Sequence, residues 1–265
     1  MFERRDLSAH APSAHDAWRH SAVASLHPRQ VMLVTDFDGT LAEIAPDPTE
    51  ARILPATVAA LSRLAGLISR VAVLSSRPTS DLVRMVPVSG IDLIGDSGLV
   101  DLTSDERQRL DRFNVKAAQL LSGTPGVWLE IKPGATAIHY RHAQVGAAEI
   151  LRALEPLLQS SGLFVQPGRR VVEVIPRLQP KGAALARLIE RRRPHGVVCL
   201  GDDENDRPMF DYLAGQTLPH LTVGVASDEA RADLFAACDL VMSGPAEVSR
   251  FLMMLSEWAT GYRPG

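Results

Sequence analysis

Three short apolar runs constrain the fold of this 265-residue chain more than any other feature. Each is rich in β-branched residues, apolar on both faces and ended by polar residues or glycine: VMLVT (31–35), RVAVLS (70–75) and GVVCLG (196–201). Such strands are typical of a parallel sheet that is covered on both sides. Helical patterns precede the second and third runs, at 55–69 and 181–193, and two more short strands are expected at 92–96 and 221–225. The alternation predicts an α/β fold with a doubly wound, Rossmann-like parallel-sheet core.

Residues 105–178 follow a different pattern of helix, hairpin, helix and hairpin, and each hairpin is expected to turn at a Pro-Gly pair, at 133–134 and 167–168. Antiparallel hairpins within a parallel α/β protein indicate an inserted α+β domain. We therefore predict a core at 28–104 and 179–265, and a cap at 105–178 that moves on connectors near Ser104 and Gln179. Residues 1–27 carry charges throughout and are expected to form a mobile N-terminal extension.

The composition limits which kinds of molecule the protein is expected to bind and in which compartment it is expected to lie. The net charge of −3 gives no basis for a nucleic-acid or membrane surface. No run is long and apolar enough to cross a bilayer, and the N-terminus lacks the apolar region of a secretory signal. The two cysteines form neither a disulfide framework nor a C-x-x-C metal pair. These features favour a cytoplasmic protein.

Polar residues follow each of the three buried strands. In open α/β sheets the active crevice lies beyond the carboxyl ends of the strands, so these residues should form one cluster. It would hold about five carboxylates, whose mutual repulsion a hard divalent cation with oxygen ligands relieves, and Mg²⁺ is the natural choice. The cluster comprises Asp36, Asp38, Gly39 and Thr40, then Ser75, Ser76 and Arg77, then Asp202, Asp203, Asn205 and Asp206.

A cation in such a cluster favours phosphate chemistry. Asp36 would attack phosphorus and become an aspartyl-phosphate. Asp38 would protonate the leaving alkoxide and later activate water. Ser75 and Lys181 would hold the phosphoryl oxygens, and Arg77 is assigned to substrate binding. Each of these motifs taken alone is also compatible with a turn or a solvated side chain; their order at successive strand ends is what favours a site.

Four segments resemble the four motifs of the haloacid dehalogenase-like hydrolases, which are Mg²⁺-dependent phosphohydrolases with an aspartate nucleophile. They are DFDGTLAEIAPDP, VAVLSSRP, PKGAAL and GDDENDRPMF. The chain is more similar to one branch, the trehalose-6-phosphate phosphatases, which carry a cap between the second and third motifs. The similarity to this branch includes EIKPGATAIHYR and VVEVIPRLQPKG in the cap region.

The resemblance implies a role for each matching residue. Asp36 would be the nucleophile and Asp38 the general acid/base, while Ser75 and Lys181 would bind the phosphoryl group. Mg²⁺ would be held by Asp36, the carbonyl of Asp38 and Asp202, with support from Asp203 or Asp206. In the cap, Glu130, Lys132 and Glu173 match residues that contact sugar hydroxyls in this branch. The alternation of Glu130 and Lys132 with apolar residues is also what any half-exposed strand shows.

Three positions depart from the pattern of the branch. Ser76 replaces a glycine, GDSG (95–98) replaces Gly-x-His-Gly, and Asn205-Asp206-Arg207 replaces Thr-Asp-Glu. The missing histidine would be a substrate contact, which Ser97 replaces only in part. The catalytic and metal-binding aspartates and Lys181 are all present, so the departures bear on the identity of the sugar.

The leading hypothesis is a phosphatase that hydrolyses trehalose 6-phosphate in trehalose biosynthesis, with a small-molecule sugar phosphate as its partner. An association with a trehalose-phosphate synthase is compatible with the sequence. Three alternatives stay open: a phosphatase of sucrose phosphate, mannosyl-phosphoglycerate or a hexose phosphate; a phosphomutase, which shares the D-x-D chemistry; and a non-catalytic regulatory domain.

Overall fold

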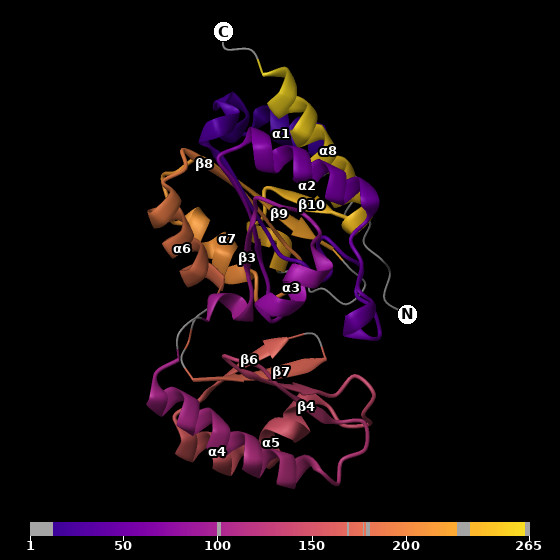
Figure 1. The fold of residues 1–265 in the computed structure, drawn as a ribbon, viewed down its shortest axis with the longest axis vertical. Helices are drawn as coiled ribbons and strands as arrows, with labels where there is room; N and C mark the ends of the chain where they lie inside the picture. Colours follow the sequence, from indigo (N-terminus) through magenta and orange to yellow (C-terminus); the bar gives the residue numbers. More distant parts are fainter. Residues whose placement is uncertain are drawn as a thin grey trace.

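The computed structural model describes residues 13–99, 102–168, 170–176, 178, 181–226 and 234–262. The elongated molecule has two parts, each built on its own sheet (Figure 1). The core sheet has six parallel strands in the order β10 (Leu240–Met242), β9 (His220–Val225), β8 (Gly196–Gly201), β1 (Val31–Thr35), β2 (Arg70–Leu74) and β3 (Asp92–Ile94). The predicted fold class, a doubly wound parallel-sheet core with a separate α+β cap, is confirmed.

Both faces of the core sheet are covered by helices, which explains why its central strands are apolar throughout. Along β1, Val31 and Leu33 belong to one hydrophobic cluster, whereas Met32 and Val34 belong to the cluster on the opposite face. The first face is covered by α1 (Ala14–His20), α2 (Pro55–Leu67), α3 (Thr79–Met85) and α8 (Pro245–Gly261). The second face is covered by α6 (Lys181–Arg192) and α7 (Arg207–Ala214).

The cap sheet is antiparallel, and the helices of the described cap residues cover one of its faces. Its strands lie in the order β4 (Trp128–Ile131), β5 (Thr136–His139), β7 (Val171–Ile175) and β6 (Phe164–Gly168). The helices α4 (Ser104–Leu121) and α5 (Ala147–Ser161) pack on it through a cluster that includes Phe113, Ile138 and Leu154. The opposite face of the sheet is turned towards the core (Figure 1).

Three local features differ from the sequence-based expectations. Pro167 and Gly168 do not form a turn but lie in β6, paired with Val172 and Val171, because an edge strand tolerates a proline that donates no ladder bond. The short strand β10 was not predicted. The part of the N-terminal segment that is described, residues 13–27, packs on the core instead of extending from it: Trp18 is 3% exposed and its ring lies 4.9 Å from that of Trp258.

The cap meets the core at a small apolar cluster of Leu99, Ala135 and Ile175. On one side α4 begins at Ser104, where Thr103 caps the helix by accepting a hydrogen bond from the Glu106 backbone. The other expected connector, Gln179, lies outside the described residues. We keep the boundaries 28–104, 105–178 and 179–265 as a proposal. Among the helices of the described segments, none combines the length and apolar character that a bilayer crossing requires.

Candidate active site

Asp36 directly follows β1 at the centre of the core sheet, between the ends of β2 and β8. Its backbone N–H donates to the carbonyl of Leu200, which fixes the residue to the end of β8. The residue is 4% exposed, and its Oδ1 accepts a 2.6 Å hydrogen bond from Lys181 Nζ. This places Asp36 where the carboxyl ends of three parallel strands converge.

Lys181 connects two buried carboxylates. It is fully buried and donates at 2.6 Å to both Asp36 Oδ1 and Asp206 Oδ1. Burial alone would lower the pKa of Lys181, but the carboxylates of Asp206 and Asp36 raise it above its ordinary value. Lys181 is the first residue of α6, and the next residue, Gly182, allows close packing: a Cβ there would lie 2.2 Å from the carbonyl oxygen of Pro208 at the start of α7.

The carboxyl group of Asp36 is a weaker acid than an ordinary aspartate. Burial raises its pKa to about 7, and Asp206 and Asp38 add to the rise, whereas Lys181 lowers it. A nucleophilic carboxylate has to be ionised at the working pH. Positive charge near Asp36 therefore decides whether the group is ready to react.

Asp202 lies beside Asp36 at the end of β8. It is 2% exposed, and Thr40 Oγ1 lies 3.4 Å from its Oδ1. The loop after β1 approaches it so closely that a Cβ on Gly39, whose φ is +75°, would lie 2.0 Å from Asp202 Oδ2. Only glycine fits this position, which accounts for the glycine directly after Asp38.

The carboxylates of Asp36, Asp202 and Asp206 bring oxygen atoms within 4.8 Å of one another, all three residues being buried. Asp206 is committed to Lys181 and to the backbone N–H groups of Asp202 and Asp203. Asn205, in the same loop, has a buried Oδ1 that has no hydrogen-bond partner among the described residues, and it lines the cavity described below. These all-oxygen donors fit a hard divalent cation such as Mg²⁺.

Asp203 takes a different position from its neighbour Asp202. It is half-buried, and its Oδ1 accepts a 2.7 Å hydrogen bond from the backbone N–H of Glu204. It lines the cavity but does not belong to the three-carboxylate cluster. Asp206 occupies that cluster, and sequence reasoning had given it only a supporting position. The spacing of aspartates within a loop does not reveal which of them turns inward.

Asp38 is held by Arg77 through two hydrogen bonds. Arg77 Nε donates to Oδ2 at 2.6 Å and Nη2 donates to Oδ1 at 2.7 Å, which is a bidentate pair. The guanidinium also lies 5.3 Å from the ring centre of Phe37. Burial lowers the pKa of Arg77, but the bonds and charge of Asp38 outweigh it and raise the pKa above its ordinary value. The charge of Asp38 is therefore matched inside the core.

The two serines after β2 have separate surroundings. Ser75 is 1% exposed, and its Oγ accepts a 3.2 Å hydrogen bond from the backbone N–H of Arg77. Ser76 lines the cavity, and its carbonyl accepts a 3.0 Å hydrogen bond from Lys132 Nζ of the cap. The segment 75–77 thus connects the end of β2 with two contacts: the bidentate pair of Arg77 with Asp38, and the hydrogen bond from Lys132 of the cap.

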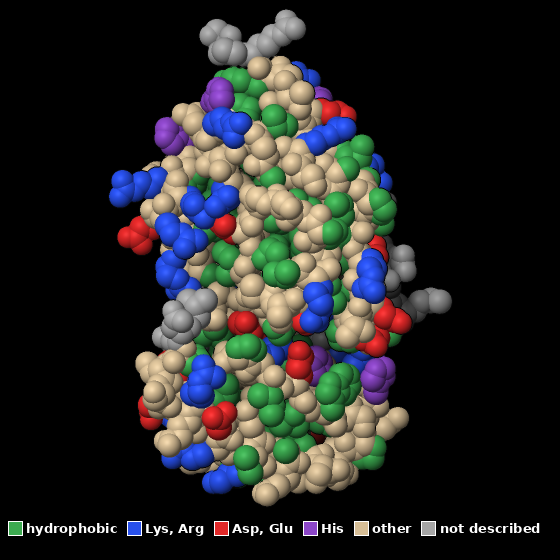
Figure 2. Space-filling model, viewed as in Figure 1, with side chains coloured by type: hydrophobic (Ala, Val, Ile, Leu, Met, Phe, Trp, Pro, Cys, Tyr) green, Lys and Arg blue, Asp and Glu red, His purple; other side chains and the backbone are tan. Residues whose placement is uncertain are grey.

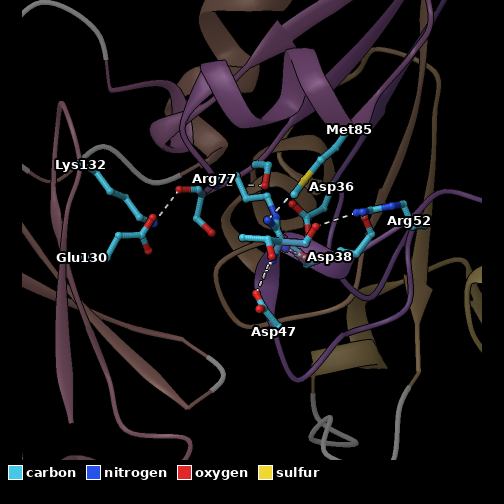
Figure 3. A network of polar contacts seen from close by, with 12 residues as sticks. Asp36, Asp38, Asp47, Arg52, Arg77, Met85, Glu130 and Lys132 are labelled. Carbon is cyan, nitrogen blue, oxygen red and sulfur yellow. Dashed lines mark hydrogen bonds and ion pairs between the residues drawn. The ribbon is translucent and has the colours of Figure 1, made fainter.

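The cap contributes a cluster of charged side chains that face the core. Lys132 Nζ donates at 2.6 Å to Glu173 Oε1, and Glu130 Oε2 lies 2.9 Å from Nε2 of His139. Figure 3 shows Glu130 and Lys132 reaching from the cap towards Arg77, Asp36 and Asp38. The hydrogen bond with His139 lowers the pKa of Glu130, with Lys132 contributing in the same direction.

A cavity of about 640 Å³ joins these groups. Its core wall includes Asp36, Asp38, Arg77, Asp202 and Asp203, and its cap wall includes Glu130, Lys132 and Glu173. Of the ten predicted site residues, Ser75 and Lys181 lie behind this lining. Figure 2 shows acidic, basic and histidine side chains gathered at the waist between the two parts. Among the further wall residues that sequence reasoning missed are Trp128, His139 and His142. The register of the cap hairpin, which would have revealed these three, cannot be read from the sequence.

Comparison with known proteins gives consistent results. The trehalose-phosphatase family model matches residues 34–233. The trehalose-phosphate phosphatase of Mycolicibacterium paratuberculosis is 34% identical over 247 residues, covering 84% of this chain and 61% of the relative. The chain thus spans about three fifths of the length of the curated relatives it matches.

Two solved structures share the fold. The C-terminal domain of Candida albicans trehalose-6-phosphate phosphatase superposes with a TM-score of 0.73 at 19% identity, covering 94% of this chain and 99% of that chain. The C-terminal domain of the Candida albicans trehalose synthase regulatory protein gives 0.62 at 16% identity, covering 92% and 98%. At these identities the likeness concerns the fold alone.

Proposed function

Because this chain belongs to the trehalose-phosphatase family, we propose that it hydrolyses trehalose 6-phosphate to trehalose and inorganic phosphate. The observation that carries the proposal is Asp36 at the floor of a cavity, paired with Lys181 behind it, while the opposite wall of the cavity is the polar face of the cap. One side of the cavity can react with a phosphoryl group, and the other can bind sugar hydroxyls. The reaction class is phosphoric monoester hydrolysis.

In the first step of this proposal, Asp36 attacks phosphorus. Its Oδ1 is bonded to Lys181, so Oδ2 forms the new P–O bond while the bond from phosphorus to the sugar oxygen breaks. The leaving alkoxide takes a proton from Asp38. Lys181 keeps the carboxylate of Asp36 oriented, and Ser75 is assigned to the phosphoryl oxygens.

In the second step, water attacks the phosphorus of the aspartyl-phosphate. Asp38 takes a proton from that water, the P–O bond to Asp36 breaks, and phosphate leaves. Arg77 binds both oxygens of Asp38, so this bidentate pair has to shift before Asp38 carries a proton. We propose that Arg77 stabilises the ionised Asp38 that the first step leaves behind, so that Asp38 can accept the proton of the attacking water, beside its assigned role in binding substrate.

The proposed cofactor is Mg²⁺, held by Asp36, Asp202 and the backbone carbonyl of Asp38, with Asp203 in support. Mg²⁺ would offset the repulsion between carboxylates and phosphate and polarise the phosphoryl oxygens. The all-oxygen character of the cluster and the unpartnered Oδ1 of Asn205 support this choice.

We propose that Glu130, Lys132 and Glu173 bind the hydroxyls of the sugar. Lys132 and Glu173 are 9% and 7% exposed and already paired, so their polar groups are held in place before substrate arrives. When sugar binds, its hydroxyls would replace part of the Lys132–Glu173 contact. Because Lys132 also donates to the carbonyl of Ser76 in the core, this change would affect the position of the cap.

The test is phosphate release from a panel of sugar phosphates, with and without Mg²⁺. We expect trehalose 6-phosphate to be turned over faster than sucrose phosphate, mannosyl-phosphoglycerate and hexose phosphates, and a chelator to remove the activity. Faster turnover of another sugar phosphate would overturn the substrate and keep the enzyme class. Isomerised sugar phosphate in place of free phosphate would indicate a phosphomutase.

A non-catalytic regulatory domain is the second candidate, because a trehalose synthase regulatory protein domain is among the structural neighbours. The enclosed Asp36–Lys181–Asp206 cluster favours catalysis, since a binding module has no use for a buried nucleophile. We also propose a cytoplasmic location, which the two free cysteines support. Association with a trehalose-phosphate synthase is testable by co-elution of the two proteins in size-exclusion chromatography.

A further inference from the structure

The face of the cap sheet that is turned to the core has two successive cross-strand rows with different chemistry. The strand registers define the first row as Glu130, Ala137, Glu173 and Gln166. They define the second row as Trp128, His139, Val171 and Gly168. The cavity is lined by three members of the first row and by all four of the second. The first row is polar and acidic, whereas the second is aromatic and apolar.

The two rows lie at different distances along the strands from Lys132, which contacts the core. Lys132, which follows β4, touches the core through the carbonyl of Ser76. Glu130 is two residues back along the chain and Trp128 is four residues back. At a rise of about 3.4 Å per residue, the second row lies about 14 Å along the strand from Lys132, twice as far as the first. A ligand that is anchored at Asp36 therefore meets the acidic row first.

The second row carries a stack of three rings. The ring centre of Trp128 lies 4.6 Å from that of His139 with an angle of 8° between the planes, and 5.9 Å from that of His142 with an angle of 18°. His139 is also hydrogen-bonded to Glu130, so the stack is fixed to the acidic row. We call Trp128, His139 and His142 the aromatic wall.

Trp128 is the exception among the three tryptophans of the chain. Trp18 and Trp258 pack against each other on the core, and Trp18 is 3% exposed. Trp128 remains 38% exposed although it lies in a cavity, and His142 is exposed beside it. When a ligand covers a large aromatic surface that is exposed to water within a cavity, the burial of that surface favours binding.

We propose that the aromatic wall binds the second, non-phosphorylated sugar ring of a disaccharide phosphate and thereby sets the preference for a disaccharide over a hexose phosphate. The apolar C–H face of a pyranose packs on flat aromatic surface, while its hydroxyls reach the cavity water and the polar first row. The first ring lies between Asp36 and the acidic row. This inference rests on the proposed function and deepens it, because it names the part of the site that recognises two rings.

The experiment compares trehalose 6-phosphate with glucose 6-phosphate, which presents the same phosphorylated ring without the second one. Trp128→Ala should raise KM for trehalose 6-phosphate about tenfold and leave kcat near that of the wild type. KM for glucose 6-phosphate should stay within about twofold, because no second ring is present to lose its contact. Trp128→Phe should give an intermediate KM for the disaccharide and guards against a folding defect in the alanine variant.

Ile131→Ala is the matched control. Ile131 lies on the same strand with its side chain 67% exposed, and it does not line the cavity. Both KM values should be unchanged in this variant. Equal effects of Trp128→Ala on the two substrates would assign Trp128 to the fold of the hairpin and overturn the inference, as would an unchanged KM for the disaccharide.

A binding measurement separates this inference from the proposed function. Titration with trehalose itself should change the tryptophan fluorescence of the wild type and leave Trp128→Ala unaffected, whether or not phosphate is released. Absence of turnover together with a Trp128-dependent response to trehalose would remove the proposed reaction and keep the subsite. Turnover of trehalose 6-phosphate without any such response to trehalose would remove the subsite and keep the reaction.

Discussion

The core and the cap both place charged groups on the cavity, but they surround them differently. In the core, Lys181 and Asp206 have fully buried side chains and the side chain of Asp36 is 6% exposed, so each charge is matched before any ligand arrives. In the cap, the side chain of Glu130 is 39% exposed and its partner His139 is 16% exposed. The difference indicates a division of work. The core encloses the nucleophile Asp36 and its partners, and the cap keeps part of its polar surface available for exchange with a ligand.

The sharpest test of this division is removal of the nucleophile. Asp36→Asn keeps the size of the side chain and its bond with Lys181, but an amide does not attack phosphorus. We expect kcat to fall by at least about 10³-fold while the protein stays folded. Phosphate release measures the first effect and circular dichroism the second. Asp111→Asn, at an exposed position of α4, is the control. Activity that survives in Asp36→Asn would contradict the proposed mechanism.

Lys181 tests whether the core charges depend on one another. Lys181→Met leaves Asp36 and Asp206 buried without their cation, which should lower the free energy of unfolding by about 3 to 5 kcal/mol. Denaturant unfolding followed by fluorescence measures it. Lys116→Met is the matched control, because Lys116 is exposed on α4 and should change stability by less than about 0.5 kcal/mol. Equal stability of the two variants would show that the buried network is not needed for folding.

The cap is expected to respond chiefly through binding of the sugar phosphate, with a loss of stability beside it because Lys132 and Glu173 are a buried pair. Lys132→Ala removes bonds to Glu173 and to the carbonyl of Ser76, and we expect KM for the sugar phosphate to rise about 10- to 100-fold with a smaller change in kcat. Steady-state kinetics measures both constants. Lys116→Ala serves as the control. A fall in kcat with an unchanged KM would place Lys132 in the chemical step and remove the contrast between the two regions.

The core and the cap also differ in how much of their part of the site could be predicted from the sequence. The polar residues after β1, β2 and β8 were expected to meet, and they do, because the carboxyl ends of parallel strands converge whatever the loops between them do. The partner of Asp38 was not predicted, since a side chain as long as that of Arg77 reaches several neighbours. The choice of Asp206 over Asp203 in the three-carboxylate cluster depends on the turn of the loop, where the backbone N–H of Asp206 donates to the carbonyl of Asp203.

The cap was predicted less completely for a related reason. Alternation along β4 placed Glu130 and Lys132 on one face, but which residues stand opposite them depends on the register of β5 and β7. Pro167–Gly168 resembled a turn, and the chain passes through it as an edge strand. The aromatic wall arises from these registers and so could not be derived from residue types alone.

The smallest effect is expected at Asp96, which lies on the core side of the junction. Asp96 is 8% exposed, its Oδ1 has no hydrogen-bond partner among the described residues, and its φ is +52°. Burial raises its pKa to about 6, although Lys132 of the cap lowers it, and Glu173 raises it further. The folded protein therefore holds a proton on Asp96 more tightly than the unfolded chain does.

The sign of the pH dependence follows from this difference. Below about pH 4 the carboxyl is protonated in both states and costs the fold nothing; as the pH rises to about 6, the unfolded chain ionises first and the fold loses stability. Asp96→Asn removes this loss, so its advantage in the free energy of unfolding over the wild type should grow between pH 4 and 6 and then stay constant. We expect about 1 kcal/mol, less than the full pKa difference would give, because solvent screens part of the charge. Denaturant unfolding of both proteins across this range, with Asp111→Asn as the control, measures it. A difference that does not vary with pH would show that Asp96 titrates as it does in the unfolded chain and that its burial at the junction places no cost on its charge.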